Sequence, residues 1–329
     1  MTPSSSGLLG STDPTLQASV NAGLERVEER LREVVRSSHP LLTEAAAHLV
    51  EAGGKRFRPL LTLLAAEFGQ GVLPEVVDAA VVVELTHLAT LYHDDVMDEA
   101  PVRRGAASAN TRWTNTVAIL TGDYLFARAS DLTAGLGTEA THLQSRTFAR
   151  LVEGQIAETA GPSDGQDPVA HHVQVLADKT GSLISTSARL GALMAGADRA
   201  LVETLAEYGE VIGIAFQLSD DLIDVLSETG ESGKTPGTDL REGIATLPVL
   251  LVRAGEDAAL QKLLDGDLTS DVALAEALRQ LRAHPAMTEA RERLQAYVDR
   301  AREIASSLPA GPAREALVAL TDFVLARTG

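Results

Sequence analysis

Two groups of three aspartates have the residue type and spacing needed to hold a divalent cation. The first acidic motif consists of Asp94, Asp95 and Asp98, and the second acidic motif consists of Asp220, Asp221 and Asp224. Each motif closes a mostly apolar segment with helical periodicity, so its carboxylates gather at a helix C-terminus, where the helix dipole disfavours negative charge. A hard cation such as magnesium, which takes oxygen ligands and phosphate oxygens, removes this repulsion. One such motif alone is most simply a solvated helix end, but its repetition favours a metal site.

Basic residues near the first acidic motif indicate that the cation binds together with phosphate. Arg103 and Arg104 follow the motif within one loop, and their planar guanidinium groups pair well with phosphate oxygens. Upstream, a Gly-Gly pair precedes three further cations, Lys55, Arg56 and Arg58, at the start of an apolar helix. Cations at a helix N-terminus oppose the dipole, so this placement predicts a bound anion such as pyrophosphate.

Two more segments carry candidate phosphate ligands. Lys179 is a single cation among apolar neighbours, and alone it is most simply a lysine that extends its amine to solvent. Beside two acidic motifs it becomes a candidate phosphate ligand. Residues 229–243 form a polar, Gly-rich stretch with Lys234 and Asp239 that is longer than a structural turn requires. We expect this loop to move over a bound ligand.

Helices are expected to position all of these residues. The segments with helical periodicity are 24–34, 41–52, 79–92, 116–136, 143–160, 169–197 and 201–226. Hydrophobic residues make up 45% of the chain but aromatic residues only 3%, a composition typical of closely packed helices. We therefore expect an all-α fold, with a single domain at 13–329 after a mobile tail at 1–12 that is rich in Ser, Gly and Thr.

Composition also excludes several classes of protein. The formal net charge of −18 argues against nucleic-acid partners and anionic membrane surfaces, because both are bound through basic patches. The absence of cysteine excludes disulfides, thiolate metal sites and cysteine nucleophiles. Charges interrupt every apolar run before it reaches membrane-spanning length, and no signal peptide is evident. We expect a soluble, unprocessed, cytoplasmic protein with no transmembrane segment.

Taken together, these motifs resemble the polyprenyl synthetase family, the all-trans isoprenyl diphosphate synthases. The resemblance covers roughly residues 24–250. Its motifs, in the family's order, are Gly53-Gly54-Lys55-Arg56-x-Arg58-Pro59, the first acidic motif after His93, Arg103-Arg104-Gly105, Gly122-Asp123, Lys179-Thr180, the second acidic motif after Gln217, and Gly233-Lys234 with Asp239. It implies a helical bundle around a deep central cavity, with the two acidic motifs facing each other across its mouth. It also implies condensation of isopentenyl diphosphate with an allylic diphosphate, with three magnesium ions per active site, in a homodimer.

The resemblance further assigns roles to individual residues. The implied metal ligands, or carboxylates behind them, are Asp94, Asp95, Asp98, Asp220 and Asp224. The implied isopentenyl diphosphate ligands are Lys55, Arg58, His87 and Arg104. The implied allylic diphosphate ligands are Arg103, Lys179, Thr180, Gln217 and Lys234. Catalysis is expected to depend on the aspartates of the metal site with Lys179 and Lys234, which meet the charge that grows on the leaving pyrophosphate.

One departure from the family's pattern concerns the segment before Thr246-Leu247-Pro248. The family commonly has a lysine there, whereas this chain has Ile244, which cannot bind phosphate. Three interpretations stay open: Arg241 supplies the charge, Lys234 suffices alone, or the allylic diphosphate is bound more weakly.

Other functions are weighed against this one. A class I terpene cyclase shares the bundle and the first acidic motif, but its second metal site usually mixes Asn, Ser or Thr with Glu, and it has no use for the basic patch at Lys55 and Arg58. A non-catalytic subunit of a two-chain prenyl synthase is expected to lack one acidic motif, and this chain has both. A di-iron helical protein would need a Glu-x-x-His pair on each of two helices. Glu139 and His142 have this spacing, but His171 and His172 have no glutamate three positions before them.

Small residues before the first acidic motif bear on product length. If the growing chain descends along this helix, successive turns form floors roughly 5.4 Å apart. Ala89, Thr90 and Thr86 occupy these positions, so no aromatic side chain blocks the first turns. Such small residues resemble the long-chain members of the family, which favours a hexaprenyl to decaprenyl product serving as a quinone side-chain precursor. Phe126 is a candidate for a deeper floor. A short-chain farnesyl or geranylgeranyl diphosphate synthase stays the alternative, because small residues also serve helix packing.

Overall fold

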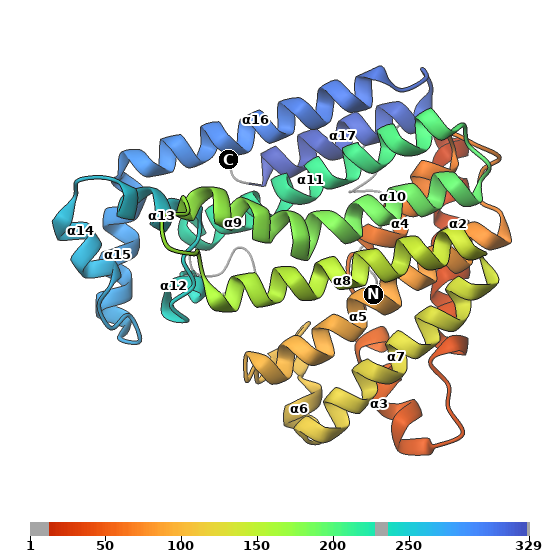
Figure 1. Ribbon diagram of the computed structural model, residues 1–329, viewed down its shortest axis with the longest axis horizontal. Helices are drawn as coiled ribbons and strands as arrows, with labels where there is room; N and C mark the ends of the chain where they lie inside the picture. Colours follow the sequence, from red (N-terminus) through yellow and green to blue (C-terminus); the bar gives the residue numbers. More distant parts are fainter. Residues whose placement is uncertain (1–12, 228–235, 328–329) are drawn as a thin grey trace. The chain divides into compact units, whose positions relative to one another are not determined.

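The computed structural model describes residues 13–227 and 236–327, and helices dominate this part of the chain (Figure 1). The N-terminal helices are α2 (Pro14–Val34), α3 (Pro40–Glu51), α4 (Phe57–Ala66), α5 (Pro74–Met97), α6 (Ala109–Arg112) and α7 (Asn115–Gly135). The middle helices are α8 (Thr138–Ala160), α9 (Pro168–Leu176), the π-helix η1 (Ala177–Gly181), α10 (Ser182–Met194), α11 (Arg199–Leu226) and α12 (Thr238–Arg241). The last helices are α13 (Leu247–Ala254), α14 (Ala258–Leu264), α15 (Asp271–Ala283), α16 (Pro285–Ser307) and α17 (Pro312–Ala326).

The strands of the described residues are confined to a short hairpin between α5 and α6. Strand β1 (Val102–Arg103) pairs antiparallel with β2 (Ala106–Ala107). The prediction of an all-α fold is confirmed.

The chain divides into two compact units. Unit 1 comprises the chain up to Arg150 with Ser182–Gly209 and Ile304–Ala319, and unit 2 comprises Leu151–Gly181, Glu210–Glu303 and the chain from Leu320. The single domain, the deep central cavity and the opposed acidic motifs stay predictions. The predicted mobile tail at 1–12 lies outside the described residues.

Helix α5 is the centre of unit 1 and packs most extensively against α7. Its buried residues surround the helix rather than forming one stripe, as expected for a helix enclosed by others. Gly122 of α7 makes the close approach possible, because a Cβ there would lie 2.4 Å from Nε2 of His93 on α5. The helices thereby fix the end of α5, where the first acidic motif lies.

The same helix α5 is, among the described residues, long and apolar enough to cross a membrane by length and composition. Core helices of soluble proteins pass this test as well, and 72% of the most apolar window of α5 is buried inside the structure. We therefore describe α5 as a core helix.

The expected helices are present, but several begin earlier than expected, including α5 at Pro74 and α8 at Thr138. The first helix begins earlier than expected, at Pro14, because Asp13 caps it by accepting a hydrogen bond from the Leu16 amide over 2.8 Å. The segment expected as one helix over 169–197 is interrupted by η1. The expected loop 229–243 contains the short helix α12, while Lys234 and the rest of 228–235 lie outside the described residues.

Candidate active site

The first acidic motif divides its side chains between two environments. Asp94 and Asp95 lie in the last turn of α5, and Asp98 follows as its C-cap, with its amide bonded to the Asp94 carbonyl over 2.8 Å. Asp98 is exposed and Asp94 half-buried, whereas Asp95 is fully buried. Its Oδ1 accepts a hydrogen bond from Nε of Arg103 over 2.6 Å. Asp95 therefore holds the Arg103 loop, and Asp98 is the exposed carboxylate of the motif.

The second carboxylate oxygen of Asp95, Oδ2, is buried and has no hydrogen-bond partner. Burial raises the pKa of Asp95, and the hydrogen bond and charge of Arg103 oppose this rise. A cation next to the motif would supply the missing compensation, and the all-oxygen donor set suits a hard ion such as magnesium.

The aspartates alone do not form a complete metal cage. Among the residues that the structure describes, no group of three or more His, Asp or Glu side chains is arranged to hold a metal ion. This fits magnesium, which usually keeps waters and takes only one or two carboxylates together with substrate phosphates. Asp94 and Asp98 are the residues of unit 1 that would hold such an ion.

A basic cluster of unit 1 surrounds one buried carboxylate, that of Glu84 on α5. Nη1 of Arg56 lies 2.7 Å and Nη2 of Arg104 3.7 Å from Oε1 of Glu84. Arg104 also donates to the carbonyls of Leu49 and Gly53. Sequence reasoning missed Glu84, which has no motif of its own and is recognised only by its long-range partners.

The electrostatics of the basic cluster favour an anion. Burial lowers the pKa of Arg58 to about 10, with Arg104 lowering it further and Glu84 opposing. Burial, followed by the charges of Arg58 and Arg104, holds the pKa of His87 well below its usual value of 6.5. Nε of Arg58 is buried and has no hydrogen-bond partner. An anion that accepts hydrogen bonds from Arg58 and Arg104 would give Nε of Arg58 a partner. Its negative charge would also oppose the lowering of the pKa values of Arg58 and His87.

The structure brings Arg58, His87 and Arg104 together as expected, with the exposed Lys55 preceding them on the chain. The expectation that the neighbouring Arg56 belongs to the anion cradle is wrong. Its guanidinium is buried and binds Glu84 and, over 2.5 Å, Glu28. Arg56 also adopts left-handed backbone geometry, with φ of 48°, as the N-cap of α4. It anchors the start of α4 rather than offering its charge to a ligand.

The second acidic motif, in unit 2, is held by protein contacts at all three positions. Asp220 forms an ion pair with Arg327, near the end of the described chain. Asp221 is buried and binds His172 of α9. Asp224 is buried and accepts from the amide of Thr238 over 3.0 Å, which fixes the start of α12. Sequence reasoning missed Arg327 and His172, since both contacts join distant segments.

Lys179 and Thr180 lie in η1, the one turn of π-helix between α9 and α10. Single π-turns inside helices frequently mark functional sites. Lys179 forms an ion pair with Glu158 of α8, and Thr180 donates to Oε1 of Gln217 over 3.4 Å. The structure therefore brings Lys179-Thr180 close to Gln217, which precedes the second acidic motif, within unit 2. Gly154 makes the room, because a Cβ there would lie 2.8 Å from Cβ of Asp178 and 3.0 Å from the Lys179 amide nitrogen.

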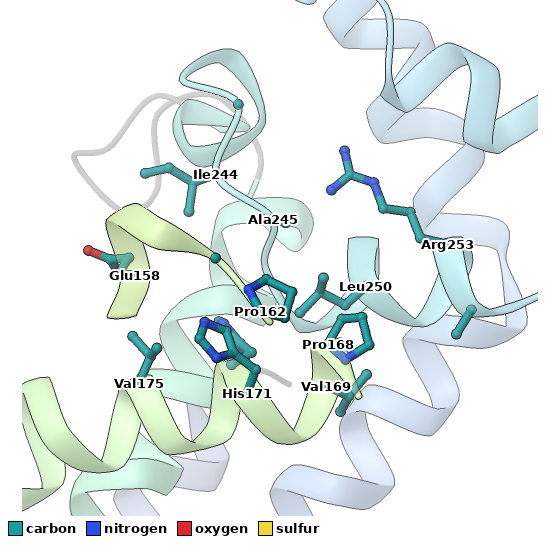
Figure 2. Close-up of a pocket in the computed structure, with 14 residues that line it drawn as sticks. Glu158, Pro162, Pro168, Val169, His171, Val175, Ile244, Ala245, Leu250 and Arg253 are labelled. Atoms are coloured by element: carbon teal, nitrogen blue, oxygen red, sulfur yellow. The ribbon is translucent and has the colours of Figure 1, made fainter. Parts of the chain in front are cut away.

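A pocket of about 570 Å³ opens beside these residues in unit 2 (Figure 2). Its lining includes Glu158, His171, His172, Ile244 and Arg253. Ile244 replaces the lysine that the family's pattern leads one to expect, and 45% of it is exposed. Arg241, the possible substitute, forms an ion pair of 2.5 Å with Asp271 on α15. Its charge is thus compensated elsewhere in this structure.

The residues expected to govern product length lie in unit 1. Ala89 and Thr86 are fully buried, and Thr90 is half-buried with its hydroxyl bonded to the His87 carbonyl over 2.8 Å. The ring centroid of Phe126 lies 5.7 Å from that of His93 and 4.2 Å from that of Phe148. Sequence reasoning missed Phe148, which comes from α8. The roles in setting product length stay predictions.

Comparisons with known proteins identify the family of the chain. The sequence model described as polyprenyl synthetase matches residues 39–281. The chain is 49% identical to the nonaprenyl diphosphate synthase of Mycobacterium tuberculosis, over 96% of each chain. The crystal structure of geranylgeranyl pyrophosphate synthase from Corynebacterium glutamicum, complexed with calcium and isoprenyl diphosphate, is 44% identical, covers 97% of this chain and 99% of its own, and gives a TM-score of 0.87. That of a decaprenyl diphosphate synthase from Rhodobacter capsulatus is 35% identical over 96% and 99%, with a TM-score of 0.87.

The all-α fold and these comparisons thus define an enzyme of prenyl diphosphate synthesis. The chain belongs to the polyprenyl synthetase family. This confirms the predicted enzyme class, a prenyltransferase that elongates prenyl diphosphates. The long-chain prediction agrees with the nonaprenyl and decaprenyl relatives.

Proposed function

We propose that the protein condenses isopentenyl diphosphate repeatedly with an allylic diphosphate to give a hexaprenyl to decaprenyl diphosphate of all-trans geometry. The observation that carries this proposal is the basic cluster of Arg58, His87 and Arg104 around Glu84, whose charges favour an anion. A terpene cyclase, with one diphosphate to bind, has no use for this second anion site. The product length is supported by the small residues Ala89 and Thr90 and by the nonaprenyl relative.

The chain's residues perform distinct parts of this reaction. Asp94, Asp98 and Asp220 would hold three magnesium ions, with Asp95 and Asp224 behind them, and bound ions would supply charge compensation for the leaving pyrophosphate. Calcium accompanies isoprenyl diphosphate in the Corynebacterium glutamicum structure, which supports a divalent ion. Arg103, Lys179 and Lys234 bind the allylic diphosphate with Thr180 and Gln217, while Lys55, Arg58, His87 and Arg104 hold isopentenyl diphosphate. Holding the two substrates together supplies much of the rate enhancement.

The proposal extends to assembly and location. Ile119 and Leu120 on α7 are 42% and 58% exposed, and this apolar surface supports a homodimer in which α7 is covered. The protein would act in the cytoplasm, on substrates dissolved there, without a nucleic-acid partner. Light scattering at micromolar concentration tests the assembly, and a monomer at all concentrations contradicts it.

The function is tested by incubating the protein with farnesyl diphosphate, labelled isopentenyl diphosphate and magnesium. Labelled prenols longer than the primer are expected after dephosphorylation, and none when a chelator is present. Asp94→Ala and Asp220→Ala are expected to abolish elongation without unfolding, while Asp131→Ala, at an exposed position of α7, keeps it. A cyclic hydrocarbon formed without isopentenyl diphosphate overturns the proposal.

A further inference from the structure

One carboxylate oxygen of the second acidic motif connects three segments of unit 2. Oδ2 of Asp221 lies 2.8 Å from Nε2 of His172 on α9 and accepts the Leu247 amide of α13 over 3.1 Å. Both side chains of the His172–Asp221 pair are mostly enclosed, with 14% and 5% exposed. A buried carboxylate needs such partners, because an ion left without them in the interior is strongly disfavoured.

The position of Asp221 makes this contact relevant to the metal site. Asp221 lies between Asp220 and Asp224 on the last turns of α11. Fixing its side chain therefore fixes the rotation of the helix end that presents both neighbours. The partner His172 lies on α9, two turns before Lys179 in η1. The contact thus joins the helix that carries Lys179 to the helix that carries the second acidic motif.

We propose that His172 is a positioning residue for the second acidic motif, which it orients through Asp221 for binding of a divalent metal and pyrophosphate. This inference rests on the proposed function, because it assumes that the motif binds metal. His172 itself touches neither substrate nor metal in this account. Groups that orient metal ligands in this way are typically worth about 10- to 100-fold in metal affinity or activity when they are removed.

The neighbouring histidine provides a matched control. His171 lines the same pocket (Figure 2). Its Nε2 lies 3.1 Å from the carbonyl oxygen of Ala157 rather than from a carboxylate. Substitution of either histidine removes the same side chain from the same helix. Only substitution of His172 removes the side chain that contacts Oδ2 of Asp221.

The pocket permits a chemical test of the contact. Because His172 lines the pocket of about 570 Å³, His172→Ala would leave space that is continuous with it. Imidazole in the buffer can then enter and donate to Asp221 in place of the lost ring. His172→Leu removes the donor but keeps most of the volume, so imidazole should not help it. This second variant also serves if His172→Ala does not fold.

The experiment measures the magnesium concentration that gives half-maximal elongation, together with KM for isopentenyl diphosphate. A rise of about 10- to 100-fold in the magnesium requirement is expected for His172→Ala and His172→Leu, and less than about threefold for His171→Ala. The KM for isopentenyl diphosphate should stay unchanged, because Arg58, His87 and Arg104 belong to unit 1. Millimolar imidazole should lower the magnesium requirement of His172→Ala only.

A binding readout separates failure of this proposal from failure of the proposed function. Magnesium is titrated with inorganic pyrophosphate, and the rise in Tm is followed for each variant. In this titration, the His172 variants should again require about 10- to 100-fold more magnesium than the wild type. If the wild type binds but does not elongate, the proposed function is wrong while the titration still tests His172. Equal magnesium requirements for the His171 and His172 variants, or a KM change as large as the metal effect, would overturn the positioning role.

Discussion

Glu84 and Arg56 form a buried ion pair in which Oε1 lies 2.7 Å from Nη1 and only 2% and 6% of the side chains are exposed. The pair has two consequences. It draws Arg56 away from the surface, and it places one negative charge beside Arg58 and Arg104. Without Glu84, three guanidinium groups would share a mostly enclosed region with Glu28 as their remaining carboxylate partner.

Glu84→Gln is therefore expected to lower the free energy of unfolding by about 3 kcal/mol, because it leaves buried cations without their counter-charge. Urea unfolding measures this loss. The control is Glu33→Gln, which removes one carboxylate of an exposed pair with Arg30 and is expected to cost less than about 1 kcal/mol. Equal effects of the two substitutions would refute the central place of Glu84.

The lowered pKa of His87 predicts a pH dependence of stability. Below pH 6.5 the unfolded chain takes up a proton at this histidine, while the folded protein resists protonation because of burial and the nearby arginines. The contribution of His87 to the free energy of unfolding should therefore rise with pH up to about 6.5 and then stay constant. His87→Asn should flatten the slope between pH 5 and 7.5 in urea unfolding, and His142→Asn, at an exposed position, should not. A slope unchanged in His87→Asn contradicts the assignment.

Gly154 is predicted to protect the geometry of Lys179. In Gly154→Ala the new Cβ would meet Asp178 and the Lys179 backbone, so η1 must shift. Overpacking of this kind typically costs about 1–3 kcal/mol, and we expect KM for the allylic diphosphate to rise. Gly135→Ala, at the end of α7 with no atom within 4 Å of the added Cβ, is the control and should change neither quantity appreciably. Wild-type kinetics in Gly154→Ala would remove Lys179 from the allylic site.

Sequence reasoning was strongest where the signal was local. The acidic motifs and the helices that carry them could be predicted, because apolar periodicity and the repeated aspartate spacing lie within short stretches. The family resemblance, rather than periodicity, assigned Arg58, His87 and Arg104 to one site, and the structure brings them together.

Contacts between distant segments could not be predicted in this way. Arg56 and Glu84 are 28 residues apart, His172 and Asp221 are 49 apart, and Arg327 and Asp220 are 107 apart. Single charged residues carry no periodic signal, and only the packing of helices decides which of them meet. The π-turn at Lys179 was likewise hidden, because it depends on the room that Gly154 leaves on another helix.

Phe126 is predicted to limit the length of the product by closing the far end of the space that holds the growing chain. Its ring packs on Phe148 of α8, with centroids 4.2 Å apart, and Phe126 itself lies on α7, the helix that packs most extensively against α5. If this aromatic pair ends the space that holds the growing chain, Phe126→Ala should lengthen the product by one or more isoprene units. Thr90→Tyr, nearer the first acidic motif, should shorten the product. Ala89→Tyr is expected to shorten it as well, with a loss of stability because Ala89 is fully buried. Mass spectrometry of the dephosphorylated products measures these changes, and identical products from all variants would remove these residues from length control.

The product length of the wild-type protein is the measurement that tests the account most directly. The protein is supplied with farnesyl diphosphate, excess isopentenyl diphosphate and magnesium, and the prenols released by phosphatase are resolved by mass. The proposed function predicts all-trans products from hexaprenyl to decaprenyl, formed only when isopentenyl diphosphate and magnesium are both present. Products that end at geranylgeranyl contradict the long-chain assignment, and absence of any elongation contradicts the assignment of both diphosphate sites.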